Sequence, residues 1–230
     1  AGLRHVHYSD FGSTTNPRLA LVWDTAYNLT TKLMAGTAFR PPSFTELYAI
    51  NNPVVQGNAA LKPEKSRTIE AAVSWQASPQ WQVSANIFHY KIDNIIQLVS
   101  GVYQNKGKQS GNGLELESNW AINSALRLSG NYSFQYSIDG ANQHNAGNAP
   151  HRQLYARADW RMLPKWSAHA QINWISNQKR AYNDTRPSLS GYNTVDLTVR
   201  SAHEGKSWNT AISVRNLFDA DVREPASISL

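Results

Sequence analysis

Hydrophobic and polar residues alternate with a period of two along most of the chain. In residues 126–137, leucine, glycine, tyrosine and phenylalanine at even positions alternate with arginine, serine, asparagine and glutamine at odd positions. A period of two places alternate side chains on opposite faces of a β-strand. The pattern predicts an all-β protein of roughly 11 strands, near 2–10, 18–24, 29–39, 67–77, 80–93, 109–121, 125–138, 151–162, 166–178, 191–203 and 207–217.

The predicted connections alternate between short and long. Short turns are expected at 24–28, 77–80, 121–124, 163–165 and 203–206. Longer segments rich in Asn, Gly, Ser and Pro lie at 11–17, 40–66, 94–108, 139–150 and 179–190. Short turns at one end of an antiparallel meander and long loops at the other are the layout of an outer-membrane β-barrel, with the short turns on the periplasmic side. A soluble β-sandwich would explain the alternation but not this rhythm of loops.

Most of the tryptophans lie beside the predicted short turns. Indole rings concentrate at membrane–water interfaces, where the ring meets lipid and the N–H stays hydrated. Trp174 lies eight positions along its strand from Trp166 and is expected to reach the opposite interface. The other seven flank predicted short turns and are expected in one periplasmic belt on the outer face: Trp23, Trp75, Trp81, Trp120, Trp160, Trp166 and Trp208.

Charged residues occupy the other face of the predicted strands. A charge on the lipid side of a barrel costs several kcal/mol, so these side chains are expected to face the lumen. They are Glu70, Glu115, Glu117, Asp159, Asp196, Arg127, Arg157, Arg161, Arg200 and Arg215.

The amino-acid composition further narrows the classes of protein to which the chain can belong. No run of about 18–20 apolar residues is present, so no membrane-spanning helix is predicted. There is no cysteine, which excludes disulfides and cysteine-ligated metal sites. The formal net charge of +6 is not clustered on any one predicted face, so no nucleic-acid partner is expected.

Three segments carry more specific information. Residues 32–48 pass through Phe39-Arg40-Pro41-Pro42 to Glu46-Leu47-Tyr48, residues 57–70 contain Asn58-Ala59-Ala60-Leu61-Lys62-Pro63-Glu64, and residues 214–219 end in Asn216-Leu217-Phe218-Asp219. Proline cannot donate a ladder hydrogen bond, so the first segment ends a strand near Arg40 and the second prepares entry into the next strand. The third ends a strand in turn-forming residues.

In this order the segments resemble TonB-dependent outer-membrane receptors of the siderophore-receptor type. In that family a strand ends in Phe-Arg-Ala-Pro, an Asn-Pro-x-Leu-x-Pro-Glu box opens the next strand, and the penultimate strand runs into Asn-Leu-Phe-Asp. The motif residues are interpreted first as folding and register devices. Alternatively, Arg40, Glu46 and Glu64 pair around the mouth of the loop. The residues that carry the resemblance are Phe39, Arg40, Pro41, Pro42, Glu46, Leu47, Tyr48, Asn58, Leu61, Pro63, Glu64, Asn216, Leu217, Phe218 and Asp219.

The resemblance implies a 22-stranded transmembrane barrel closed by an N-terminal plug, in the bacterial outer membrane and in contact with lipid. Residues 1–230 are then expected to be a C-terminal portion, about half of the wall, because eleven strands is an odd number and bacterial barrels have even numbers. The plug domain, the segment that contacts TonB and the last strand are expected to lie outside these residues.

The implied function is import of a scarce ligand with energy passed on by the TonB complex. A ferric siderophore is the expected ligand, with haem, cobalamin and copper as alternatives within the family. Haem receptors of the family carry a haem-ligating histidine between the two boxes, and residues 41–56 contain none. Ligand contacts are expected from Arg40, Tyr48, Tyr103, His144 and Tyr182.

Two other classes compete with a receptor, namely an outer-membrane enzyme and a soluble β-sandwich binding module. An enzyme would need a nucleophile or an acid–base set near the rim, and no Ser/His/Asn or Asp/His spacing points to one. We therefore predict that the chain is not an enzyme, and we assign no catalytic residue, no metal ligand and no cofactor.

Overall fold

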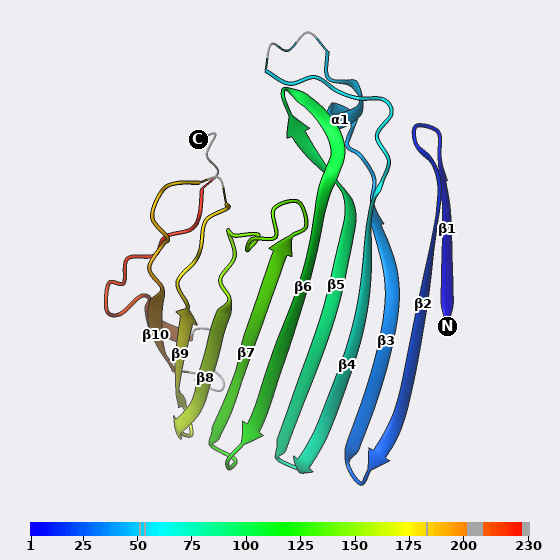
Figure 1. The fold of residues 1–230 in the computed structure, drawn as a ribbon. Coiled ribbons are helices and arrows are strands. Elements are labelled where there is room, and N and C mark those ends of the chain that lie inside the picture. The colour runs from blue at the N-terminus through cyan, green and yellow to red at the C-terminus, as the bar shows by residue number, and fades with distance from the viewer. Residues whose placement is uncertain (51, 53, 183, 202–208, 227–230) are drawn as a thin grey trace.

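The computed structural model describes residues 1–50, 52, 54–182, 184–201 and 209–226. Within these residues one curved antiparallel sheet contains eleven strands, each paired with its neighbours in sequence (Figure 1). The predicted all-β meander is confirmed. The strands are β1 (Gly2–Tyr8), β2 (Gly12–Ala26), β3 (Leu29–Arg40), β4 (Glu64–Ser78), β5 (Trp81–Val99), β6 (Val102–Ala121), β7 (Leu126–Asp139), β8 (Arg152–Leu163), β9 (Trp166–Ile175), β10 (Tyr192–Ser201) and β11 (Thr210–Val214).

The described part of the chain has one helix, α1 (Phe44–Tyr48), in the connection between β3 and β4. It is five residues long. No helix among the described residues has the length and apolar character needed to cross a membrane. Four short turns lie along one edge of the sheet, and the long connections with α1 lie at the opposite end (Figure 1).

The pairing registers separate the two faces of the sheet as predicted. Leu116 lies opposite Tyr132, and Tyr132 lies opposite Leu154, so apolar residues continue from strand to strand on one face. On the other face Arg127 lies opposite Asp159, and Asp159 lies opposite His169. All the predicted lumenal charges that lie in strands occupy this polar face.

The tryptophans beside the short turns share the apolar face. Trp81 lies opposite Trp120, and the ring of Trp81 is 6.1 Å from that of Trp75 and 5.6 Å from that of Trp120. Trp160 lies opposite Leu126, which the register places on the same face. The row of indoles predicted at the short-turn edge is therefore present for Trp23, Trp75, Trp81, Trp120, Trp160 and Trp166, whereas Trp208 lies outside the described residues.

Rows of paired residues cross the sheet obliquely. Starting at Trp23 near the short-turn end of β2, the pairs run through Thr31, Val73, Ala85, Leu116, Tyr132 and Leu154 to Trp174. Trp174 lies at the far end of β9, eight positions from Trp166 at the turn. One row of paired residues thus begins at the short-turn edge of the sheet and ends at the opposite edge. Such a row is expected in a barrel wall, because its strands are tilted relative to the barrel axis. The apolar band lies between the edges that Trp23 and Trp174 mark.

Two of the predicted long loops are wrong. Residues 94–108 are not a loop, because β5 and β6 continue as a hairpin to a turn at Ser100 and Gly101. Both turn residues have positive φ, 51° and 81°, which matches the two-residue turn that fits twisted strands. Residues 11–17 are also largely strand, since β2 begins at Gly12 and pairs with β1 from there. The turn-forming and polar residues of these segments misled the prediction, because backbone pairing continues a hairpin beyond the part of the strands where apolar and polar residues alternate.

The small hydrophobic core lies in the connection between β3 and β4 rather than in the sheet. Among the described residues, the buried hydrophobic side chains are Leu47, Leu61 and Ile96, at 4%, 3% and 9% exposure, and Tyr103 packs against them. A one-layer sheet has no interior of its own, since one face meets lipid and the other the lumen. Burial therefore begins where this connection folds against the β5–β6 hairpin.

Candidate functional site

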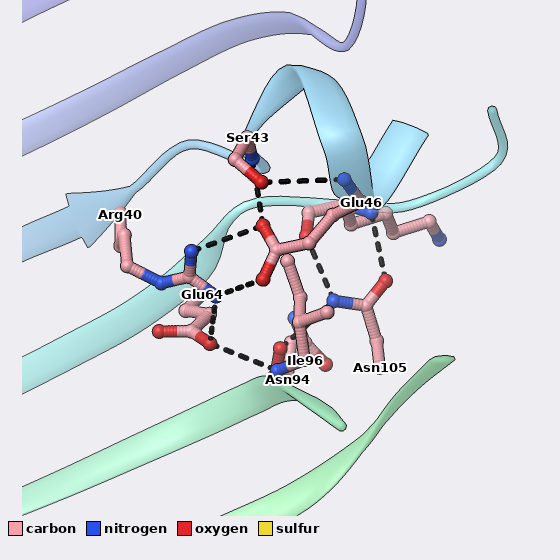
Figure 2. Close-up of polar contacts among 8 residues, drawn as sticks. Arg40, Ser43, Glu46, Glu64, Asn94, Ile96 and Asn105 are labelled. Carbon is pink, nitrogen blue, oxygen red and sulfur yellow. Dashed lines mark hydrogen bonds and ion pairs between the residues drawn. The ribbon is translucent and has the colours of Figure 1, made fainter. Parts of the chain in front are cut away.

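The connection between β3 and β4 is held by one arginine and two glutamates, which we call the clasp (Arg40, Glu46 and Glu64). Arg40 Nη1 donates to Glu46 Oε2 at 3.0 Å, and Arg40 Nη2 donates to Glu46 Oε1 at 3.0 Å and to Glu64 Oε1 at 2.6 Å (Figure 2). Arg40 ends β3 and Glu64 begins β4, so the clasp closes the connection at its base. A planar guanidinium suits this role because it can serve two carboxylates at once.

A capping box fixes Glu46 in the clasp. Ser43 is the N-cap of α1, and its hydroxyl accepts a hydrogen bond from Glu46 N at 3.2 Å. The Glu46 carboxylate in turn accepts from Ser43 N at 2.6 Å. Partial burial by itself raises the pKa of Glu46, but the hydrogen bonds from Arg40 and Ser43 outweigh it and lower the pKa below its ordinary value. The S-x-x-E spacing of Ser43 and Glu46 is a signal for a helix start that the sequence analysis did not use.

The clasp also reaches the β5–β6 hairpin. Glu64 Oε1 accepts a second hydrogen bond from Ile96 N at 2.8 Å (Figure 2). Beside it, Asn105 Nδ2 donates to the carbonyl oxygens of Lys62 and Asn94, both at 2.8 Å, and Lys62 N donates to Asn105 Oδ1. The base of the connection and the hairpin are therefore one hydrogen-bonded unit.

The second motif segment completes this unit. Asn58 Nδ2 donates to the carbonyl of Tyr103 at 3.0 Å, and Asn58 N donates to the carbonyl of Glu46 at 2.9 Å. Leu61 packs with Leu47 in the buried cluster. Pro42 and Pro63 are buried at either end of the connection. These contacts support the interpretation of the motif residues as folding devices, and the alternative pairing of Arg40 with Glu46 and Glu64 forms within the same unit.

The third motif segment forms a turn after β11. Asn216 and Asp219 have positive φ, 48° and 52°, and Asn216 Oδ1 accepts from Ala220 N at 2.9 Å. Asn216 N donates to Asp196 Oδ1 at 2.8 Å, and Leu217 N donates to the carbonyl of Val195. Asn216 therefore joins the turn to β10 on the lumenal face. Phe218 is 71% exposed.

Two further connections fold together at the same end of the sheet. Asn148 N, after β7, donates to the carbonyl of Lys179, after β9, at 2.7 Å. The ring of His144 stacks on that of Tyr182 with centroids 4.1 Å apart and an interplanar angle of 7°. An ion pair stabilises the second connection, because Arg186 donates to both carboxylate oxygens of Asp184. These hydrogen bonds lower the pKa of Asp184 to about 2.

A polar recess of about 460 Å³ opens between these connections and the β5–β6 hairpin. Tyr182 contributes to its wall and is 64% exposed. Stacked rings and amide groups around such a space offer both flat contacts and hydrogen-bond donors. Sequence reasoning missed most of the polar lining, although the Asn-rich stretch 139–150 was a signal for it: Gln97, Lys108, Gln109, Asp139, Asn142 and Asn145.

The structure divides the predicted ligand residues into two groups. Tyr182 lines the polar recess, and His144 stacks on Tyr182 without itself lining the recess. Arg40 lies in the clasp, Tyr48 packs against Phe44 with the rings tilted by 57° and their centroids 4.9 Å apart, and Tyr103 packs on the buried cluster. The first group comes from the connections after β7 and β9, and the second lies in and around the β3–β4 connection and the β5–β6 hairpin.

The lumenal face below carries a second polar array. Arg157 donates to both oxygens of Asp159, which also contacts the ring nitrogen of His169. Gln171 Nε2 donates to Asp196 at 2.8 Å, and Arg215 lies in the same recess of about 340 Å³. Such an array can hold a polar surface by charge-assisted hydrogen bonds. Among the described residues, no group of three His, Cys, Asp or Glu side chains gathers at metal-binding distance.

Comparison with known proteins agrees with this architecture. Residues 1–217 match the family described as "TonB dependent receptor-like, beta-barrel". The vitamin B12 transporter BtuB of Vibrio cholerae is 27% identical over 238 aligned positions, which cover 96% of this chain and 36% of BtuB. The chain thus spans about a third of the length of the curated relatives it matches.

Solved structures share the fold. The ferric enterobactin receptor PfeA of Pseudomonas aeruginosa, in complex with enterobactin, superposes with a TM-score of 0.84 at 20% identity, covering 94% of this chain and 37% of PfeA. The siderophore receptor PirA of Acinetobacter baumannii gives a TM-score of 0.81 at 17% identity, covering 94% of this chain and 38% of PirA.

Family membership decides several of the predictions. TonB-dependent receptors are transport proteins of the bacterial outer membrane, so the predicted location is confirmed, as is the prediction that the chain is not an enzyme. From the match over residues 1–217 and the eleven-stranded meander, we conclude that the chain belongs to the TonB-dependent receptor-like β-barrel family.

Proposed function

We propose that residues 1–230 form part of the wall and ligand mouth of a receptor that imports a ferric siderophore with energy from the TonB complex. The observation that carries the proposal is the polar recess with its stacked His144–Tyr182 pair. Ferric chelates present flat rings and oxygen atoms, which match stacked aromatic side chains and amide or ammonium donors. The fold shared with two siderophore receptors supports the same ligand class.

The proposal also covers the organisation of the chain. Residues 1–230 constitute a C-terminal portion of a 22-stranded barrel, with the plug domain, the TonB-contacting segment and the last strand outside them. The share of the relatives that the chain covers, 36–38%, supports this division. The lumenal array around Arg157 and Asp196 is then the surface that faces the plug.

Within the mouth, His144 and Tyr182 are proposed to contact the ligand directly. Tyr48, at 38% exposure, is proposed to contact it from the neighbouring connection. Arg40 and Tyr103 are proposed to act mainly by holding that connection in place, since each is engaged in the folded unit described above. Arg40 keeps part of its guanidinium accessible, with 45% of the side chain exposed.

Cobalamin is the second candidate ligand, because the curated relative BtuB is named as a vitamin B12 transporter. A corrin is a broad ring system edged with amides, and the amide-rich lining of the recess suits it as well. Haem and copper have less support. No histidine stands at 41–56, and no three-residue cluster of potential metal ligands forms in the described part of the chain.

Growth experiments separate these ligands. Deleting the gene should abolish growth on one ferric siderophore under iron limitation and leave cobalamin-dependent growth intact. The reverse pattern would assign cobalamin and retain the receptor class. Uptake that persists in a strain without TonB would overturn the class of transport.

Binding experiments test the mouth itself. In the intact receptor, Tyr182→Ala and His144→Ala should each weaken binding of the siderophore roughly fivefold, as expected for loss of a stacking contact of about 1 kcal/mol. Tyr27→Ala is the matched control, because Tyr27 is 90% exposed in a short turn at the opposite edge. Equal affinities for all three variants would remove the recess as the ligand site.

A further inference from the structure

The apolar face of the sheet carries a groove that the ligand mouth does not use. It has a volume of about 790 Å³ and crosses β2 to β6. Ala35 and Ala71 form its low floor, and the larger Leu33, Ile69 and Ile87 rise beside them with 46%, 65% and 56% exposure. These residues share the face of the tryptophan belt. The groove therefore opens toward the hydrocarbon of the membrane.

The polarity of this face changes abruptly at one end of the groove. His89 and Asn112 line that end, and His89 Nδ1 is 2.8 Å from Asn112 Oδ1. They lie opposite each other on β5 and β6, next to Ile69 of β4. This rung lies on the side of the sheet away from the short turns. It therefore marks the outer-leaflet boundary of the apolar band.

The next rung, about 7 Å farther along the strands, carries like charges. Arg67 of β4 lies directly opposite Lys91 of β5, and Lys65 follows on the same face. All three are exposed. Asp93 lies opposite Lys65 in the register, and its carboxylate oxygen is 3.7 Å from Arg67. Lys65 and Lys91 have no ion pair within the described residues. Like charges opposite each other on adjacent strands destabilise a sheet, so this rung favours a bound anion.

The two features are continuous and fit one kind of molecule. An anionic group at Arg67 and Lys91 would sit at the boundary of the outer leaflet, and a hydrocarbon chain attached to it would extend into the groove below. Charges at such a boundary attract anionic lipid head groups, each cation contributing about 1 kcal/mol. We infer that β4 and β5 form a binding site for a phosphorylated lipid of the outer leaflet, with its phosphate on Arg67 and Lys91 and an acyl chain over Ala71. This site is separate from the ligand mouth, and its lipid binding does not depend on which substrate the receptor imports.

Lipid binding to the intact receptor in a neutral detergent tests the inference. Native mass spectrometry would compare phosphatidylglycerol with phosphatidylcholine of the same acyl chains. Phosphatidylglycerol should bind more tightly to the unmodified receptor. Arg67→Gln with Lys91→Gln should lower its affinity about thirtyfold, from the loss of two cation contacts, and leave phosphatidylcholine binding unchanged. Equal affinity for the two lipids, or an unaltered double variant, would overturn the site.

Further variants separate the head group from the chain and from folding. Lys165→Gln, which removes an exposed cation from the turn between β8 and β9, should leave both affinities unchanged. Ala71→Phe should fill the groove and weaken binding of both lipids. Lys91→Gln alone should weaken phosphatidylglycerol binding about fivefold and leave the melting temperature equal or higher, because it removes a like-charge contact. An equal loss in Lys165→Gln, or binding of soluble glycerol phosphate as tight as that of the lipid, would contradict a lipid site.

Discussion

Arg40 is a residue on which contacts between several elements depend. Its guanidinium bonds to carboxylates from α1 and from β4, and the β4 carboxylate also accepts the amide of Ile96. One side chain therefore connects the end of a wall strand, a helix and the β5–β6 hairpin. The buried cluster around Leu47 and Leu61 packs within the frame that these bonds set.

Replacing Arg40 tests this role. In the intact receptor, Arg40→Ala should lower the free energy of local opening of the β3–β4 connection by about 1–2 kcal/mol, less than for a fully buried pair because the arginine is nearly half exposed. Hydrogen exchange should accelerate at the amides of Leu47 and Gly57, which donate to Ser43 and Ala49. Arg186→Ala, in a different connection, should leave those amides unchanged. Unchanged exchange in Arg40→Ala would show that the clasp does not hold the connection.

Glu46 gives the same connection a dependence on pH. Its folded pKa lies below the ordinary 4.5, so its contribution to stability is complete above about pH 4.5 and is lost as the pH falls through the lower folded value. A nitroxide at Ile50, which is 76% exposed beyond α1, should therefore be equally immobile at pH 7 and pH 5.5 and become mobile in stronger acid. Burial raises the pKa of Glu64, but hydrogen bonds from Arg40 and Ile96 outweigh it and lower that pKa as well, so Glu46→Gln should reduce this acid transition without removing it. A profile that Glu46→Gln leaves intact would assign the transition to another group.

Among the elements, the β5–β6 hairpin organises the end of the sheet away from the short turns. It rises beyond the neighbouring strands beside α1 (Figure 1). Its register shifts between Ile92 and Ile96, where Asn94 has a φ of 61°. A bulge of this kind bends a strand and increases its twist. The hairpin thereby presents one side to the clasp and another to the polar recess.

A substitution at the tip of the β5–β6 hairpin tests whether the β3–β4 connection depends on this hairpin. Gly101→Val should strain a residue whose φ is 81° and destabilise the tip by about 1–2 kcal/mol. Gln56 N donates to the carbonyl of Gly101, so exchange at Gln56 should accelerate while the wall strands stay protected. Gly2→Ala is the control, since an added Cβ there meets no atom within 4 Å. Equal exchange in the two variants would mean that the connection folds without the hairpin tip.

The alternation of side chains was sufficient to predict the strands, their order and their faces. When one face of a strand meets lipid, apolar residues are needed at every second position, as in residues 126–137. Strand ends were less accurate wherever a strand leaves the membrane. Residues 94–108 no longer alternate regularly there, although the strand pairing continues and Ile96 and Tyr103 pack against the β3–β4 connection. At the site, the pairing of Arg40 with Glu46 and Glu64 was an alternative interpretation of the motif residues. The recess could not be foreseen, since it depends on how connections distant in sequence pack together.

For the whole molecule, the two faces of the sheet differ in whether a strand can carry a charged side chain there. Leu116, 40% exposed on the apolar face, lies opposite Tyr132, and its neighbour Glu117 lies opposite Asn131 on the lumenal face. A charge near the middle of the apolar band must be removed from water into hydrocarbon. The same charge one position away stays hydrated.

A pair of substitutions measures this difference. Leu116→Arg should destabilise the intact receptor in bilayers by about 2–4 kcal/mol, whereas Asn131→Arg, beside Glu117, should change stability by less than about 1 kcal/mol. Urea titration of the receptor folded in lipid vesicles reports both values. Similar losses for the two variants would contradict the assignment of the faces.

The oblique row from Trp23 to Trp174 has a mechanical consequence. Because the strands are inclined, a tension applied along the membrane normal resolves into a component along the strands and a component across them. The component along the strands loads many inter-strand hydrogen bonds together in shear, whereas a pull straight across the strands would open them one after another like a zip. A sheet inclined in this way can therefore stay intact while something is drawn forcibly through the space it encloses.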